Sequence, residues 1–160
     1  MTSPRFEALF VALANERVDY VLVGGVAAVV HGAARATYDL DIVYARTAEN
    51  IDRLVRALAA LQPYLRGAPP GLPFSWDADT LRRGLNFTLT TTAGDIDLLG
   101  EVTYGHGFED LAADSEVVTV FGVECRCVSL GRLITLKRAA GRPKDLEALA
   151  ELEALAEERR

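Results

Sequence analysis

Apolar side chains recur along this chain with two periods, one typical of helices and one typical of strands. Near the N-terminus, Ser3 and Pro4 suit the first turn of a helix whose apolar stripe runs to Leu13. Thr47 suits the N-cap of a second long helix. Helical stripes are found at residues 6–13, 47–61, 130–140 and 143–158, and shorter helices are predicted at 26–31 and 76–83.

Strand spacing occurs in shorter stretches that are bounded by glycine and other turn residues. Ala93-Gly94 and Gly122 are predicted to be the turns of two hairpins. Residues 66–73 contain two glycines and three prolines, so this segment is predicted to be a loop and is a candidate lid. The predicted strands are residues 20–23, 38–43, 85–92, 95–99, 117–121 and 123–128.

Gly24 and Gly25 separate the strand at 20–23 from the small apolar helix at 26–31. Free backbone N–H groups and the helix dipole at such a junction can hold a phosphate. A glycine pair is also typical of any tight turn that requires positive φ. The pair by itself therefore leaves both interpretations open.

Asp39 and Asp41 are two residues apart on a predicted strand, so their side chains share one face, about 7 Å apart along the strand. Leu40 and Ile42 then point into the core. Two carboxylates held this close repel each other, which raises the pKa of one of them unless a cation lies between them. Hard oxygen ligands of this kind suit Mg²⁺.

A third candidate ligand, Asp97, is flanked by Ile96 and Leu98 on another strand, which places its carboxylate on the face opposite the core. Asp95 is predicted to be a turn residue. Three converging carboxylates could surround two metal ions that bridge an attacking oxygen and a leaving pyrophosphate. The alternative is that these aspartates are ordinary surface acids on an edge strand.

A basic cluster surrounds Gly141, which suits the C-cap of one helix, while Pro143 suits the first position of the next. The cluster could neutralise a triphosphate. It could equally consist of solvated cations that complement a helix C-terminus. Its members are Lys137, Arg138, Arg142 and Lys144.

Composition limits the class of protein. The 160 residues, half of them apolar, predict a single domain over residues 1–160. The formal net charge of −6 argues against nucleic-acid binding through the whole surface, but a local basic patch remains compatible with it. Cys125 and Cys127 are predicted to be reduced strand residues. Without a leader or a membrane-length apolar run, the expected location is cytoplasmic, with no membrane partner.

Four motifs in order resemble the minimal nucleotidyltransferases of the DNA polymerase β superfamily, and most closely the small bacterial branch near AbiEii-type toxins and lincosamide nucleotidyltransferases. The resemblance implies an α/β (α+β) nucleotidyltransferase fold, a mixed β-sheet flanked by helices with a C-terminal helical pair. It implies two Mg²⁺ ions and an NTP, whose nucleoside monophosphate is transferred to an acceptor hydroxyl with release of pyrophosphate. The motifs are Gly24-Gly25, RATYDLDI at 35–42, IDLL at 96–99 and LKRAAGRPKDL at 136–146.

Position by position, the resemblance implies that Asp39 and Asp41 ligate the metals and that Asp97 holds the catalytic metal and helps to deprotonate the acceptor. Many members have Ser directly after the glycine pair, whereas this chain has Val26, which leaves only backbone amides for the phosphate. Arg35 and Thr37 also suit turn or capping roles. The candidate nucleotide-binding residues are Gly24, Gly25, Arg35, Thr37, Lys137, Arg142 and Lys144.

Two functions from different classes follow. The first is a Mg²⁺-dependent nucleotidyltransferase that acts on tRNA or on a small hydroxylated molecule, as the toxin of a toxin–antitoxin system in one version. The second is a non-catalytic module that keeps the fold and binds a nucleotide or a partner. Three convergent carboxylates favour the enzyme, because binding alone does not require them. An antitoxin or a second copy of the chain is the expected protein partner.

Overall fold

A computed structural model of the chain describes residues 5–160. Helices and strands alternate through most of the chain, and two long helices end it. The helices are α1 (Phe6–Asn15), α2 (Gly24–Val30), α3 (Ala48–Leu58), α4 (Ala78–Arg83), α5 (Phe108–Ala113), α6 (Leu130–Ala140) and α7 (Pro143–Glu158), with 3₁₀ turns at Ala59–Leu61 and Thr103–Gly105. The strands are β1 (Tyr20–Val23), β2 (Asp39–Tyr44), β3 (Tyr64–Leu65), β4 (Phe87–Thr91), β5 (Gly94–Leu99), β6 (Glu101–Val102), β7 (His106–Gly107), β8 (Ser115–Val120) and β9 (Val123–Val128).

Seven strands form one mixed sheet in the order β3-β4-β5-β2-β1-β9-β8, and β6 and β7 form a separate pair. At its centre β1 runs antiparallel to β2, and β2 runs parallel to β5. The register places Asp41 opposite both Val23 on β1 and Asp97 on β5. The end of β1, where the glycine pair follows, therefore lies beside the aspartates.

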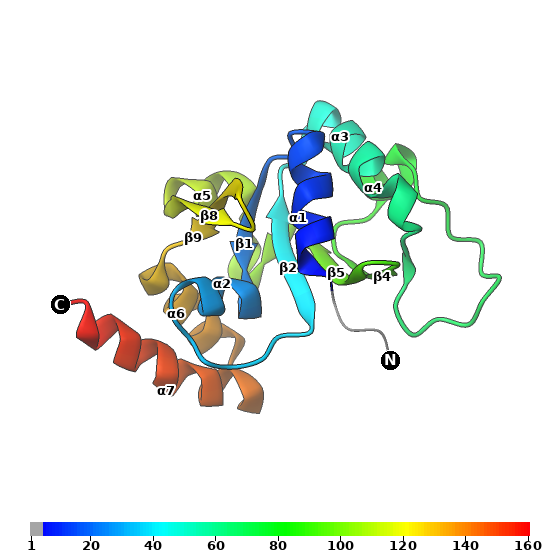
Figure 1. Ribbon diagram of the computed structural model, residues 1–160. Helices are drawn as coiled ribbons and strands as arrows, with labels where there is room; N and C mark the ends of the chain where they lie inside the picture. The colour runs from blue at the N-terminus through cyan, green and yellow to red at the C-terminus, as the bar shows by residue number, and fades with distance from the viewer. Residues whose placement is uncertain (1–4) are drawn as a thin grey trace.

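The helices flank the sheet on several sides (Figure 1). In that view α1 lies near the centre, α3 and α4 lie at the upper right, α5 lies at the upper left beside β8 and β9, and α2, α6 and α7 lie at the lower left. The last two helices pack against each other as a pair. A mixed sheet flanked by helices, with a C-terminal helical pair, confirms the predicted fold class.

The core forms where the strands bury alternate or all side chains. Every residue of β1 is buried, as expected for a short β-branched strand at the centre of a sheet. In β2 the side chains of Leu40 and Ile42 are fully buried while Asp39 and Asp41 face the other way. Each such aliphatic side chain contributes about 2 kcal/mol through burial. The apolar positions thus fix the direction in which the aspartates point.

Local signals set several helix ends as predicted. The Thr47 hydroxyl accepts a hydrogen bond from the Asn50 N–H and caps α3. Gly141 ends α6 with a φ of +65°, and Pro143 begins α7. The start predicted at Ser3 and Pro4 lies outside the described residues.

Some predicted boundaries were wrong. Asp95 is not a turn residue: it lies in β5, opposite Asp39 on β2. The turn before it consists of residues 92–93, and Gly94 already belongs to the strand, with a φ of +121°. Pairing with β2 extends β5 in this direction, and this is a tertiary effect that the local turn residues did not reveal. The two-residue strand β3 was not predicted.

Cys125 and Cys127 are both free and buried on β9, as predicted. The Cys127 thiol lies 3.8 Å from Nε2 of His31, which is itself buried and hydrogen-bonded at 2.7 Å to the Val128 carbonyl. Burial raises the pKa of the Cys127 thiol to about 12, so it stays protonated at neutral pH. Within residues 5–160, no helix combines the length and the apolar character that are needed to cross a membrane.

Candidate active site

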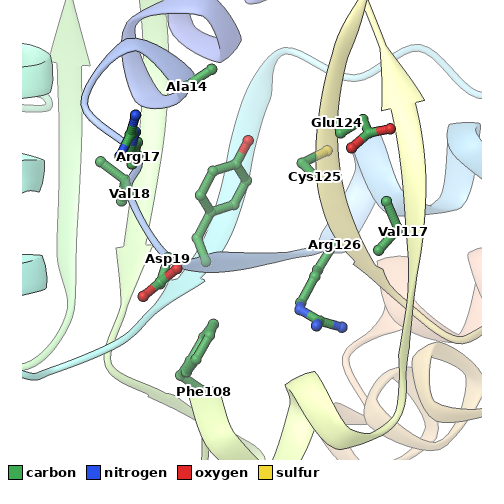
Figure 2. A pocket seen from close by; sticks show the side chains of 10 residues that line it. Ala14, Arg17, Val18, Asp19, Phe108, Val117, Glu124, Cys125 and Arg126 are labelled. Carbon is green, nitrogen blue, oxygen red and sulfur yellow. The ribbon is translucent and has the colours of Figure 1, made fainter.

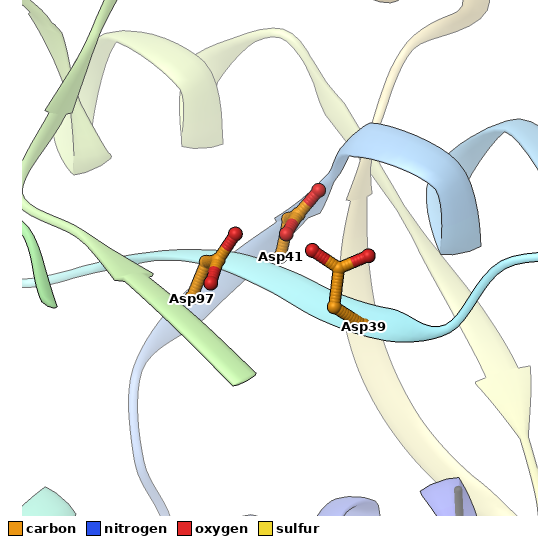
Figure 3. A group of neighbouring side chains, drawn as sticks. All are labelled: Asp39, Asp41 and Asp97. Atoms are coloured by element: carbon orange, nitrogen blue, oxygen red, sulfur yellow. The ribbon is translucent and has the colours of Figure 1, made fainter. Parts of the chain in front are cut away.

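Three carboxylates from two neighbouring strands point to one spot on the sheet surface (Figure 3). Asp39 and Asp41 come from β2, and Asp97 comes from β5. One oxygen from each of the three lies within 4.8 Å of the others. This separation is compatible with shared coordination of a cation, because carboxylate oxygens lie 2.0 to 2.6 Å from Mg²⁺ or Ca²⁺.

Asp41 is the carboxylate that most clearly lacks a counter-charge. Its Oδ1 is buried and has no hydrogen-bond partner among the described residues. Burial, followed by repulsion from Asp39 and Asp97, raises its pKa to about 8. Burial and repulsion from Asp97 also raise the pKa of Asp39. An orphaned carboxylate oxygen at the centre of an acidic cluster fits a divalent metal ion, which would supply the missing charge and contact.

The glycine turn fits closely against these carboxylates. Gly24 has a φ of +68°, and a Cβ at this position would overlap the Asp41 carboxylate. A Cβ at Gly25 would lie 2.7 Å from the Thr37 hydroxyl. Helix α2 begins at Gly24 itself, so the glycines form its first turn rather than preceding it. The missing side chain at Gly24 thus makes space for the Asp41 carboxylate, and the missing side chain at Gly25 makes space for Thr37.

A cavity of about 430 Å³ opens next to the carboxylates, between the segment before β2 and the C-terminal helices. The three aspartates form one end, and basic side chains from the α6–α7 junction line the other parts. Gly24 lines an adjoining cavity with Asp41 and Lys137. Predicted site residues that line the main cavity are Gly25, Arg35, Thr37, Asp39, Asp41, Asp97, Lys137, Arg142 and Lys144.

Asp145 organises the basic end of the cavity. Its side chain is fully buried, accepts hydrogen bonds from Arg142 Nε at 2.6 Å and Lys137 Nζ at 3.3 Å, and also accepts from the Arg142 N–H. Burial opposes ionisation, yet the hydrogen bonds from Arg142 and Lys137 lower the pKa of Asp145. The two cations are thereby held beside Asp41, whose negative charge Lys137 partly offsets.

The chain matches no family model and no curated protein. Its structure is similar to the crystal structure of TM1012 from Thermotoga maritima, which is provisionally named a nucleotidyltransferase. The TM-score is 0.58 at 17% sequence identity, over 91% of this chain and 88% of TM1012. The two proteins share one fold. The nucleotidyltransferase fold predicted from the sequence is therefore confirmed, whereas the branch near AbiEii-type toxins and lincosamide enzymes stays a prediction.

Arg35, Thr37 and Lys144 differ in how they sit within this fold. Arg35 lies 3.7 Å from both Glu147 and Glu151 on α7, so its charge is shared with that helix. The Thr37 hydroxyl donates to the Asp39 carbonyl at 3.1 Å, which is the turn role considered from sequence. Lys144 forms no ion pair within the described part of the chain and is exposed at the cavity. Of the two cations, Lys144 therefore has the charge that is more available to a ligand.

Sequence reasoning overlooked two residues of the site. Arg66 donates a hydrogen bond to Asp97 Oδ1 at 2.7 Å and also reaches Asp39 and Asp95. Nothing in the loop-like segment around it pointed to the carboxylates, because the contact depends on the pairing of β3 with β4. Asp145 lies within the LKRAAGRPKDL motif, but no role is assigned to it from the sequence. Its position three residues after Arg142, at the start of a helix, was the available signal.

A second cavity, of about 350 Å³, lies at the other end of β1 from the glycine turn (Figure 2). Ala14 and Arg17 line one side, and Cys125 and Arg126 of β9 line the other. The buried Tyr20 hydroxyl also lines it and has no hydrogen-bond partner among residues 5–160. None of the predicted site residues contributes to this cavity.

Proposed function

We propose that this protein is a divalent-metal-dependent nucleotidyltransferase, which transfers a nucleoside monophosphate from an NTP to an acceptor hydroxyl. One observation carries the proposal: the unpartnered, buried Oδ1 of Asp41 lies in a cluster with Asp39 and Asp97, beside a cavity lined by basic residues. A purely binding module needs the basic residues but not three converging carboxylates. The shared fold with TM1012 supports the same reading.

Asp39, Asp41 and Asp97 would hold two Mg²⁺ ions. Bound there, the metal would neutralise phosphate charge and lower the pKa of an attacking hydroxyl. From the resemblance to the nucleotidyltransferases, Asp97 is the carboxylate that we assign to accept the proton of the acceptor hydroxyl.

The basic residues would bind and orient the triphosphate. Lys137 and Arg142 are fixed by Asp145, whereas Lys144 is exposed, so the cavity offers both held and mobile cations. Because Gly24 and Gly25 have no side chain, a phosphate could approach their backbone N–H groups closely. Catalysis of this type rests mainly on such positioning and on charge neutralisation.

The acceptor is either tRNA or a small hydroxylated molecule, with a toxin–antitoxin role and an antitoxin or homodimer partner as further predictions. A transfer assay decides between the two acceptor classes. Purified protein is incubated with Mg²⁺, each α-labelled NTP in turn, and either total tRNA or a pool of small hydroxylated acceptors. Label should reach one acceptor class with wild-type protein and should fail to do so with EDTA, Asp39→Asn or Asp41→Asn.

The variants must melt cooperatively for the comparison to hold. Transfer that continues unchanged in both Asp39→Asn and Asp41→Asn would remove these carboxylates from the reaction and contradict the proposal. NTP binding without transfer onto any acceptor would favour the non-catalytic module instead.

A further inference from the structure

Arg66 crosses the sheet surface from its edge to the carboxylates. It directly follows β3, and its guanidinium extends over β4 to residues of β5 and β2. Nη2 lies 2.7 Å from Asp97 Oδ1, Nε lies 3.2 Å from Asp95 Oδ2, and Nη1 lies 3.8 Å from Asp39 Oδ2. One guanidinium thus forms ion pairs with three carboxylates, two of which belong to the candidate metal site.

The same guanidinium is anchored to neutral backbone. Its Nη2 and Nε donate to the Leu89 carbonyl at 2.8 and 3.2 Å, and the Arg66 N–H donates to the Thr88 carbonyl at 3.1 Å. Only 27% of the side chain is exposed. Because an arginine stays charged and its donors form a rigid fork, the docked side chain is a permanent cation at this place.

Arg66 contacts two of the three clustered aspartates and leaves the third without an ion pair to it. It contacts Asp97 and Asp39, but Asp41 forms no ion pair with it and keeps an unpartnered Oδ1. A cation shared by all three carboxylates would bind two carboxylates that Arg66 already contacts. Two positive charges held against the same carboxylates repel each other unless one of them moves.

We propose that Arg66 is a built-in counter-cation that competes with the metal. It keeps Asp39 and Asp97 in place before the metal binds, and metal binding displaces its guanidinium from Asp97. Arg66 therefore raises the metal concentration at which the site fills. This inference rests on the metal site of the proposed function and adds a residue that regulates its occupancy.

Direct Mn²⁺ binding tests the competition without any catalytic readout. Free Mn²⁺ is titrated by electron paramagnetic resonance against wild type, Arg66→Met, Arg66→Lys, Asp41→Asn and a matched control, Arg83→Met. Arg83 pairs only with Asp79 on the exposed side of α4 among the described residues. We expect Arg66→Met to bind Mn²⁺ about tenfold more tightly than wild type. Arg66→Lys should gain less, and the control should not change.

Thermal unfolding with and without Mn²⁺ gives a second measure. Removal of the counter-cation should lower the melting temperature in EDTA and enlarge the increase that Mn²⁺ produces, relative to wild type and Arg83→Met. If Arg66→Met does not fold without metal, the comparison passes to Arg66→Lys, which keeps the charge but lacks the fork. A gain in its Mn²⁺ affinity then supports the proposal, and no gain overturns it.

The outcomes separate the two proposals. Binding that is lost in Asp41→Asn but is unchanged or weaker in Arg66→Met would leave the metal site intact and overturn the competition. Mn²⁺ binding that survives Asp41→Asn, or no binding by any variant, would overturn the metal site and the role of Arg66 together.

Discussion

Gly24 and Asp41 fit each other only because position 24 has no side chain. A Cβ there would overlap the Asp41 carboxylate, and the φ of +68° is itself unfavourable for other residues. The register of β1 against β2 places the end of β1 directly beside this aspartate. The glycine turn is therefore part of the carboxylate site, whatever it contributes to phosphate binding.

The first prediction separates the cost of a side chain at the positive φ of Gly24 from the cost of displacing Asp41. Gly24→Ala should lower the free energy of unfolding by about 3 kcal/mol, because backbone strain and displacement of Asp41 add together. Gly67→Ala is the matched control: its φ is +76° with no atom within 4 Å of the added Cβ, so it should cost only about 1 kcal/mol. Urea unfolding measures the free energy of unfolding of both variants. Equal losses would show that the overlap with Asp41 does not contribute to the effect of Gly24→Ala.

The second prediction concerns pH. The pKa of Asp41 is raised from 3.8 to about 8 in the folded protein. Between these values the folded state binds more protons than the unfolded state, so stability without metal should fall as pH rises. Asp41→Asn removes this loss. At pH 8 the free energy of unfolding of this variant should be about 2 kcal/mol higher than that of wild type.

The extra stability of Asp41→Asn should vanish as the pH falls towards the unfolded-state pKa of an aspartate. Urea unfolding in EDTA across the range checks it, with Asp52→Asn on the exposed face of α3 as the control. A stability profile for Asp41→Asn that parallels the wild-type profile would show that Asp41 is ionised in the folded protein throughout. Divalent metal should reverse the wild-type loss at high pH, because it binds the ionised carboxylate.

The third prediction is that Asp145 stabilises the junction between the C-terminal helices. Asp145→Ala leaves Lys137 and Arg142 without their buried partner, so the free energy of unfolding should fall by about 3 kcal/mol. Glu153→Ala removes the exposed pair with Arg138 and should cost less than about 0.5 kcal/mol. Chemical denaturation of both variants measures the difference, and similar values would mean that burial of Asp145 adds nothing.

The fourth prediction concerns the triphosphate. Lys144→Met should weaken binding of a non-hydrolysable NTP analogue about tenfold, because Lys144 lines the cavity and its charge is not taken up by an ion pair within residues 5–160. Arg138→Met is the control, since Arg138 pairs with Glu153 outside the cavity. Calorimetry measures both affinities. An equal loss in the two variants would indicate only a general effect of net charge.

The sequence by itself determined the long helices, the strands at the centre of the sheet and which way the central aspartates face. The alternation of Leu40 and Ile42 with Asp39 and Asp41 needs only the two-residue period of a strand. The end of α6 and the start of α7 follow from Gly141 and Pro143, which have strong local preferences. Such signals act within a few residues, so they can be read without knowledge of the fold.

Only the tertiary structure decided what surrounds the aspartates. The parallel pairing of β2 with β5 places Asp97 beside Asp41 and turns Asp95 into a strand residue. The pairing of β3 with β4 delivers Arg66 to Asp97, which is 31 residues away in sequence. Contacts between distant strands depend on register and on the burial of both partners. Local alternation indicates which face of a strand is buried, but it does not tell which distant strand will pair with it.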